Sequence, residues 1–188
     1  MTLAPVVLVA AEEDGLQVGR LTGGRPGQPA RVEVVDRDGK GLRTLRLPRE
    51  AVVVQLNARC ATLAEALALA EAARARIARE DLETVWLLVG DRPTGIGELA
   101  QLLLGAGDAA ARDTTTLALA LDDDAFWFDH GQPRRRSAEE RERLQAERAE
   151  RARLHAEIAP WLGAVDAVRA GATVPQDLMR SWSRRVEH

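Results

Sequence analysis

Cysteine is almost missing from this chain of 188 residues, in which Cys60 is the single example. A lone thiol can form neither an internal disulfide nor a thiolate metal cluster, so both kinds of crosslink are excluded. One cysteine of this kind is typical of a small apolar side chain in a core, and it fits a reducing compartment. We therefore expect a cytoplasmic protein.

Long apolar runs are missing as well. No uninterrupted stretch approaches the roughly 20 residues that a membrane-spanning helix requires. Residues 1–11 are apolar but carry no basic side chain, so they make a poor signal peptide and a better first strand. Because 46% of the residues are hydrophobic, we expect a globular chain of one domain or two small ones, without a membrane partner.

Few residues are available to build a catalytic or metal site. None of the three histidines, His130, His155 and His188, has a partner at metal-ligand spacing. Three consecutive carboxylates at Asp122–Asp124 point in different directions and have no second acidic cluster nearby, so they indicate a polar helix end rather than a Mg²⁺ site. The glycine-rich segment 23–27 lacks the strand-to-helix context of a phosphate loop. We expect no cofactor and no catalytic residue in this chain.

Residues 1–57 are predicted to form a small SH3-like β-barrel. Five short apolar runs of strand length lie between Pro5 and Leu56, and their separators are rich in glycine, aspartate and proline. Asp38-Gly39 suits a hairpin turn, because glycine accepts the positive φ that such a turn needs. Polar residues that alternate with apolar neighbours indicate a sheet with one face in water. The alternative is a structural cap without a ligand.

Helices dominate the next segment. Thr62 and Glu65 form a capping-box pattern that predicts a connecting helix from Leu63 to about Arg79, within residues 58–80. For residues 81–136 we predict three short helices followed by an aromatic hairpin, which is the order of a winged helix-turn-helix. The predicted N-caps of these three helices are Asp81, Thr94 and Asp108, and the third helix is expected from about Ala109 to Leu121.

The predicted hairpin holds three of the chain's six aromatic residues, Phe126, Trp127 and Phe128. Side chains alternate along a strand, so either the two phenylalanines face the core and Trp127 faces out, or the reverse. Arg134–Arg136 lie across the hairpin. An exposed aromatic residue beside arginines can stack on a base while the arginines hold phosphate. The alternative is that all the aromatic residues are core and the arginines are simply solvated.

Candidate nucleic-acid-binding residues lie on the hairpin and on the third helix of the predicted winged helix. They are Trp127, His130, Arg134, Arg135 and Arg136 on the hairpin, and Arg112 and Thr115 on the helix. The surrounding charge argues against tight binding by this chain alone, since residues 58–135 carry 8 basic and 13 acidic side chains.

Residues 137–188 are predicted to form a long charged helix and a C-terminal helical segment. Glutamate and arginine alternate at four-residue spacing beyond Ser137, as in a solvated helix. The helix is expected to reach at least Ile158. Its apolar content is thin, which favours a spacer or packing strut over a long coiled coil.

Four segments share a loose pattern of leucine, tryptophan and other aromatic residues: Asp81 to Leu88, Glu98 to Gly105, Asp123 to Phe128 with Gly131, and Arg134 to Ser137. With the charged helix behind them, they resemble the N-terminal region of ribonuclease II (RNB) family exoribonucleases of the Deinococcus and cyanobacterial type. The resemblance covers most of residues 1–160. It implies an SH3-like barrel and a winged helix in place of the family's usual cold-shock domains.

The resemblance also implies a separate catalytic domain that binds Mg²⁺ through spaced aspartates and hydrolyses RNA from the 3′ end. This sequence does not contain such a domain, and Asp122–Asp124 lack the upstream aspartates, so no catalytic residue is carried over. By resemblance the chain is a non-catalytic, substrate-guiding portion of a 3′–5′ exoribonuclease. Whether it belongs to an enzyme is left open by its sequence.

Three functions stay open at this point. The first is a region that binds RNA, single-stranded and weakly when alone, beside a catalytic RNB domain. The second is a winged-helix module that docks on a partner protein, which the acidic body favours. The third is a DNA-binding regulator, whose predicted recognition helix has a single arginine with which to read bases. We favour the first, because tethering to a catalytic domain compensates for low affinity.

Overall fold

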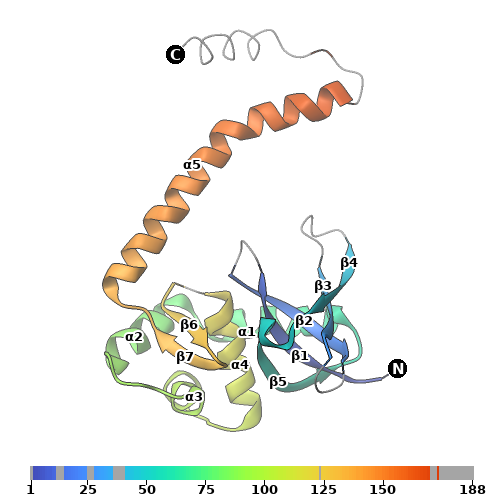
Figure 1. The fold of residues 1–188 in the computed structure, drawn as a ribbon. Coiled ribbons are helices and arrows are strands. Elements are labelled where there is room, and N and C mark those ends of the chain that lie inside the picture. Colours follow the sequence, from blue (N-terminus) through green and yellow to red (C-terminus); the bar gives the residue numbers. More distant parts are fainter. Residues whose placement is uncertain are drawn as a thin grey trace. The chain divides into compact units, whose positions relative to one another are not determined.

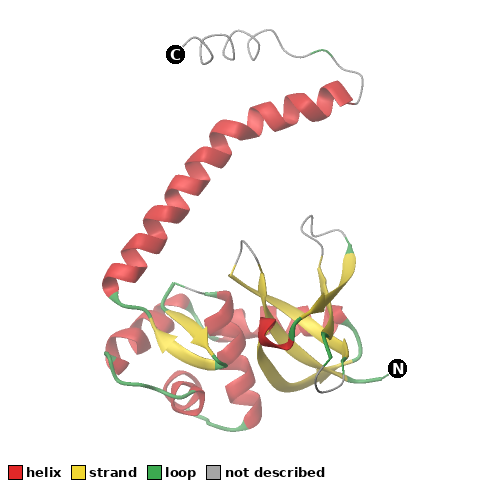
Figure 2. Cartoon of the chain, viewed as in Figure 1, coloured by secondary structure: helices red, strands yellow, loops and turns green. Residues whose placement is uncertain are grey.

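The computed structural model describes residues 2–11, 15–24, 28–35, 41–122, 124–169 and 173 (Figure 1). Their fold is α+β, with a five-stranded antiparallel sheet, a two-stranded hairpin and five α-helices in the described chain (Figure 2). The chain divides into two compact units, a first unit of residues 1–137 and a second unit of residues 138–188. The predicted barrel, connecting helix and winged helix all fall inside the first unit, and the boundaries among them stay predictions.

The first unit opens with the five-stranded sheet. Its order is β4-β3-β2-β1-β5, so the last strand returns to lie beside the first. A short 3₁₀ turn, Arg49–Ala51, leads into β5. Each of the five predicted runs lies in a strand, while the predicted Asp38-Gly39 turn lies outside the described residues. The strands are β1 (Ala4–Ala11), β2 (Gly15–Gly23), β3 (Ala30–Val35), β4 (Leu42–Leu47) and β5 (Val52–Cys60).

Strand β1 is buried on both of its faces. Val6 and Leu8 belong to a large core cluster that also contains residues of the helices. Val7 and Val9 point the other way, into a smaller cluster with valines of β3. This explains why β1 is a continuous apolar run, whereas β3 alternates between buried and more exposed positions as a sheet with one wet face does.

Four helices and the hairpin complete the first unit in the predicted order. The third predicted helix, α4, has the predicted bounds, and the hairpin follows it directly (Figure 1). The elements are α1 (Leu63–Arg76), α2 (Arg79–Val89), α3 (Ile96–Leu104), α4 (Ala109–Leu121), β6 (Phe126–Asp129) and β7 (Gln132–Arg135).

Two of the predicted helix caps are confirmed. The Thr62 hydroxyl accepts a hydrogen bond from the Glu65 backbone N–H at the start of α1. The Glu65 carboxylate reaches back and accepts from the N–H of Ala61, at 2.8 Å, one residue before the donor that a capping box predicts. At the start of α4, Asp108 accepts from the N–H of Ala111 at 2.8 Å.

The other two predicted caps are wrong. Helix α2 begins at Arg79 with Ala78 as its N-cap, and Asp81 lies inside the first turn, where its carboxylate accepts from the Ala78 N–H at 3.2 Å. Helix α3 has Gly95 as its N-cap, while the Thr94 hydroxyl instead donates to the Arg92 carbonyl. In both cases a side chain near the helix start has a different backbone partner from the one that its type predicts.

Helix α4 lies at the centre of the first unit. It packs against α1, α3, β5 and β6, so almost every side chain from Ala111 to Ala120 is buried. The large core cluster runs without a break from β1 and β2, through the helices, to Phe126 and Phe128 of the hairpin. The sheet and the helical part therefore share one core.

The second unit consists, in its described residues, of the long helix α5 (Ala138–Arg169) and residue 173. The predicted charged helix is confirmed, with ion pairs such as Arg143 to Glu147 at four-residue spacing. The predicted C-terminal helical segment lies outside the described residues apart from position 173. Throughout the described chain, every helix is too short or too polar to cross a membrane.

Burial of Cys60 leads to a prediction about its reactivity. The thiol lies in the large core cluster, and burial, together with the Glu65 carboxylate, raises its pKa, which Arg20 opposes in part. Thiolate is the reactive form, so at pH 8 the folded protein is expected to react with Ellman's reagent at least about tenfold more slowly than the urea-unfolded chain. The absorbance of released thionitrobenzoate measures this rate, and equal rates in the two states would contradict it.

Candidate nucleic-acid interface on the β6–β7 hairpin

Alternation along β6 decides which aromatic side chain faces out. Phe126 and Phe128 are buried in the core, and Trp127 between them is 39% exposed, which is the first of the two predicted orientations. The hairpin register places Arg134 directly opposite Trp127. Both side chains are exposed, and directly opposite residues of an antiparallel pair share a face. The hairpin thus presents an indole and a guanidinium side by side.

The tip of the hairpin carries His130, whose side chain is almost fully exposed. His130 and Gly131 both have positive φ, 46° and 77°, as the tight turn between β6 and β7 requires. A side chain at Gly131 would approach the Val53 carbonyl of β5 to 3.3 Å, so the turn lies close to the sheet. The Asp129 carboxylate lies 3.7 Å from His130 Nε2 and 3.7 Å from Arg134 Nε, and it offsets part of the Arg134 charge.

Arg135 points to the other side of the hairpin, where it attaches β7 to α2. Its Cζ lies 3.9 Å from the centroid of the Trp86 ring. Its Nε donates to the Trp86 carbonyl at 2.9 Å, and its Nη1 donates to Asp91 at 2.8 Å. The indole N–H of Trp86 in turn donates to the Arg136 carbonyl at 2.8 Å. Since Arg135 is engaged in this attachment, we leave it out of the candidate interface.

An apolar pocket of about 240 Å³ opens beside the hairpin. Its walls come from the sheet, through Leu16 and Val53, from Leu119 of α4, and from Trp127 and Arg136 at the hairpin. The volume is below the ~300–1,000 Å³ of pockets for drug-sized ligands, so it suits a single ring-sized group. The structure therefore brings Trp127 and Arg136, two of the predicted hairpin residues, to one pocket.

The two candidate residues on α4 do not join this interface. Thr115 is 0% exposed, so the prediction that it contacts nucleic acid is wrong. Its hydroxyl is enclosed by the core and has no hydrogen-bond partner among the residues that the structure describes. Arg112 is exposed, but its Nε donates to the Gly107 carbonyl at 2.8 Å, which holds the side chain against the turn before α4. The physical reason is that α4 packs against four other elements, which leaves little of it at the surface.

Asp113 is a structural residue that sequence reasoning missed. Its Oδ1 accepts from both the backbone N–H and the side-chain amide of Asn57, each at 3.1 Å. Its Oδ2 accepts from the Ala58 N–H at 2.7 Å. The carboxylate is buried and fastens α4 to β5. The sequence does carry a signal for this role, because Asp113 is the single carboxylate within a predicted helix that is otherwise rich in alanine, threonine and leucine.

The aspartates after α4 are engaged with an arginine. Arg79 forms an ion pair with Asp124 and lies 3.9 Å from Asp122, while Asp123 lies outside the described residues. Within the described ranges, no three histidine, cysteine, aspartate or glutamate side chains are grouped so that they could hold a metal ion.

Comparison of the chain with protein-family models, with curated proteins and with solved structures found no match.

Proposed function

We propose that the first unit binds single-stranded RNA through the β6–β7 hairpin and guides it. The observation that carries this proposal is the exposed Trp127 directly opposite Arg134, beside an apolar pocket that also contacts Arg136. A base that stacks on an aromatic side chain contributes roughly 1–3 kcal/mol, whatever its identity. Guanidinium groups beside the ring can hold the adjoining phosphates.

The arrangement of elements supports the finer fold assignment within this proposal. A meander of four strands, a 3₁₀ turn and a fifth strand paired back to β1 fit an SH3-like barrel. Three helices, α2 to α4, followed at once by a hairpin fit a winged helix-turn-helix. We accordingly propose that β6–β7 is the wing.

Burial of α4 makes DNA reading by a recognition helix a poor alternative. In a helix-turn-helix protein, residues of the recognition helix enter the major groove and contact base edges. Here α4 is covered by α1, α3, β5 and β6 over most of its length, and Ala109, Ala110 and Arg112 are its exposed side chains. Two alanines and one arginine offer little with which to contact base edges. The hairpin carries the proposal instead, and single strands offer it the unstacked bases that a duplex hides.

Docking on a partner protein is the second candidate function. The observation that favours it is a pair of exposed leucines on α2, Leu87 at 68% and Leu88 at 69%. A partner that covers these two leucines would remove their apolar surface from water, and this burial favours association.

The resemblance to ribonuclease II exoribonucleases extends the proposal to a larger protein. In that setting a catalytic domain with its Mg²⁺ would follow this region, and the hairpin would pass RNA toward it. Tethering raises the effective concentration of bound RNA near a catalytic domain, so weak intrinsic binding suffices for guiding. Hydrolysis itself is not assigned to any residue of this chain.

Fluorescence anisotropy with labelled single-stranded RNA, duplex RNA and duplex DNA tests the proposal. Trp127→Ala and Arg134→Ala are each expected to weaken binding of single-stranded RNA about tenfold, because stacking or a charged contact is lost. Arg76→Ala is the matched control, since it removes an equal charge from an exposed position on α1 away from the hairpin sequence.

Two results would contradict the proposal. If single-stranded RNA does not bind at about 50 mM salt, where phosphate contacts are strongest, docking on a protein becomes the better account. If Arg76→Ala weakens binding as much as Arg134→Ala does, the effect is one of overall charge and the hairpin is not the site.

A further inference from the structure

A pair of arginines faces each other on the outer side of the sheet, far from the hairpin in sequence. The register of β3 and β4 places Arg31 directly opposite Arg46, and both side chains are exposed. Like charges directly opposite each other destabilise a sheet. Neither guanidinium forms an ion pair or a hydrogen bond with any residue that the structure describes, so their charge is not compensated within the described sheet.

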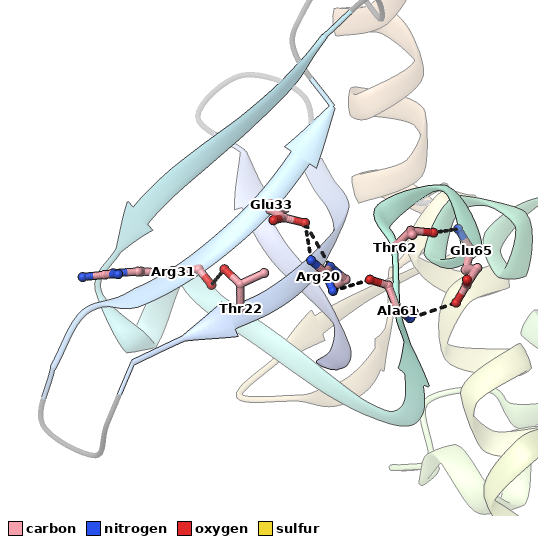
Figure 3. A network of polar contacts seen from close by, with 7 residues as sticks. All are labelled: Arg20, Thr22, Arg31, Glu33, Ala61, Thr62 and Glu65. Carbon is pink, nitrogen blue, oxygen red and sulfur yellow. Dashed lines mark hydrogen bonds and ion pairs between the residues drawn. The ribbon is translucent and has the colours of Figure 1, made fainter. Parts of the chain in front are cut away.

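The acidic side chain nearest to them in β3 is already engaged. Glu33 Oε2 accepts from both Nε and Nη2 of Arg20 at 2.9 Å, across the β2–β3 ladder. Arg20 also donates to the Ala61 carbonyl at 2.5 Å, which ties this pair to the end of β5. Figure 3 shows Arg31 extending away from the Arg20–Glu33 pair. Glu33 is therefore held by Arg20, and Arg31 stays open to an external anion.

A polar pocket of about 440 Å³ lies at these two arginines. Gly23, Gly24, Gln28 and Pro29 form the rest of its lining. Gly23 pairs with Arg31 in the ladder and has no side chain to fill the space beside it. Among the described residues, the lining of this pocket contains no aromatic side chain, in contrast to the pocket at the hairpin.

Gly24, at the edge of this pocket, is constrained by its neighbours. Gly24 has φ of 116°, and a side chain there would lie 2.8 Å from the Pro29 carbonyl, so only glycine fits at this position. Arg49 donates from Nη2 to the Gly24 carbonyl at 2.8 Å. These contacts constrain Gly24 at the edge of the pocket.

We propose that Arg31 and Arg46, with the Gly23–Gly24 edge beside them, bind the phosphodiester backbone of the same RNA that the hairpin holds. This inference rests on the proposed function and assigns the sheet a separate task. Guanidinium groups bind phosphate oxygens in a bidentate manner, and two of them side by side can neutralise two phosphates. Without an aromatic residue in the pocket, binding there reads charge and not base identity.

The salt dependence of binding separates this site from the hairpin. For a single strand, each neutralised phosphate contributes about −0.7 to the slope of log K against log salt concentration. The double variant Arg31→Gln with Arg46→Gln is therefore expected to make that slope about 1.4 less steep. Binding at about 50 mM salt is expected to weaken roughly tenfold. Trp127→Ala is expected to weaken binding without changing the slope, because stacking releases no counterions.

The control is a second double variant, Arg59→Gln with Arg76→Gln, which changes the net charge equally at exposed positions on β5 and α1. It is expected to keep the slope of the parent protein. Thermal unfolding provides a check on folding: the Arg31/Arg46 variant is expected to melt at or above the parent temperature, because it removes a like-charge pair.

The outcomes are distinguishable from those of the hairpin experiment. If the Arg31/Arg46 variant melts normally and binds RNA with the parent affinity and slope, this site is overturned while the hairpin proposal stands. If the Arg59/Arg76 control lowers the slope equally, the effect is not local and the site is likewise overturned. If the parent protein binds no RNA, both proposals fall together.

Discussion

Replacing Phe126 with alanine is expected to lower the free energy of unfolding by about 4 kcal/mol, the cost of removing a large buried aromatic side chain. Phe126 is 1% exposed and is the largest of the fully buried side chains in the described chain. It joins the hairpin to the core cluster that reaches back to β1. Because one core serves the sheet and the helices, the loss is expected to shift the whole unfolding transition, measured by circular dichroism in urea.

Trp127→Ala is the matched control for this experiment. The two residues are neighbours in β6 but point to opposite faces, and Trp127 is 39% exposed. Its replacement is expected to cost about 1 kcal/mol or less, as surface substitutions usually do. The pair of variants should separate stability, carried by Phe126, from RNA binding, assigned to Trp127. Equal losses of stability would show that the tryptophan is part of the core.

Replacing Asp113 with alanine is expected to lower the free energy of unfolding by about 3 kcal/mol, because buried donors are left without an acceptor. The backbone N–H groups of Asn57 and Ala58 would both lose their partner. Asp113→Asn keeps the shape but turns one acceptor into a donor, so an intermediate loss is expected. Urea denaturation measures both losses, and hydrogen exchange at the Ala58 amide should accelerate.

The control for the aspartate experiment is Asp91→Ala. The Asp91 side chain is 99% exposed and pairs with Arg135 at the surface. Surface ion pairs contribute about 0–1 kcal/mol, so this variant should stay close to the parent. If Asp113→Ala were no less stable than Asp91→Ala, the hydrogen bonds from β5 to α4 would not contribute to stability.

Local signals in the sequence predicted much of the fold. The start of α4 follows from Asp108, whose carboxylate accepts a hydrogen bond from a donor of the first helical turn. Strand β4 has the bounds of the predicted run from Leu42 to Leu47. These signals were sufficient because caps and alternation act over a few residues and depend little on distant parts of the chain.

Other features depend on which elements meet in three dimensions. Thr115 was predicted to contact nucleic acid, but α4 is covered on several sides by elements distant in sequence. Arg134 and Arg135 are adjacent and chemically identical, yet one faces solvent and the other stacks on Trp86 of α2. Alternation shows that consecutive side chains point to opposite faces, but not which face meets a partner.

Burial of β1 on both faces has a consequence for synthesis on the ribosome. During translation β1 emerges before every other strand and helix of the first unit, and β5, its second neighbour in the sheet, follows some 40 residues later. The core cluster that contains Val6 and Leu8 also contains Leu119 and Phe126, which emerge later still. We expect the nascent first unit to gain protease resistance only after the hairpin has left the exit tunnel, so the last element made completes the environment of the first.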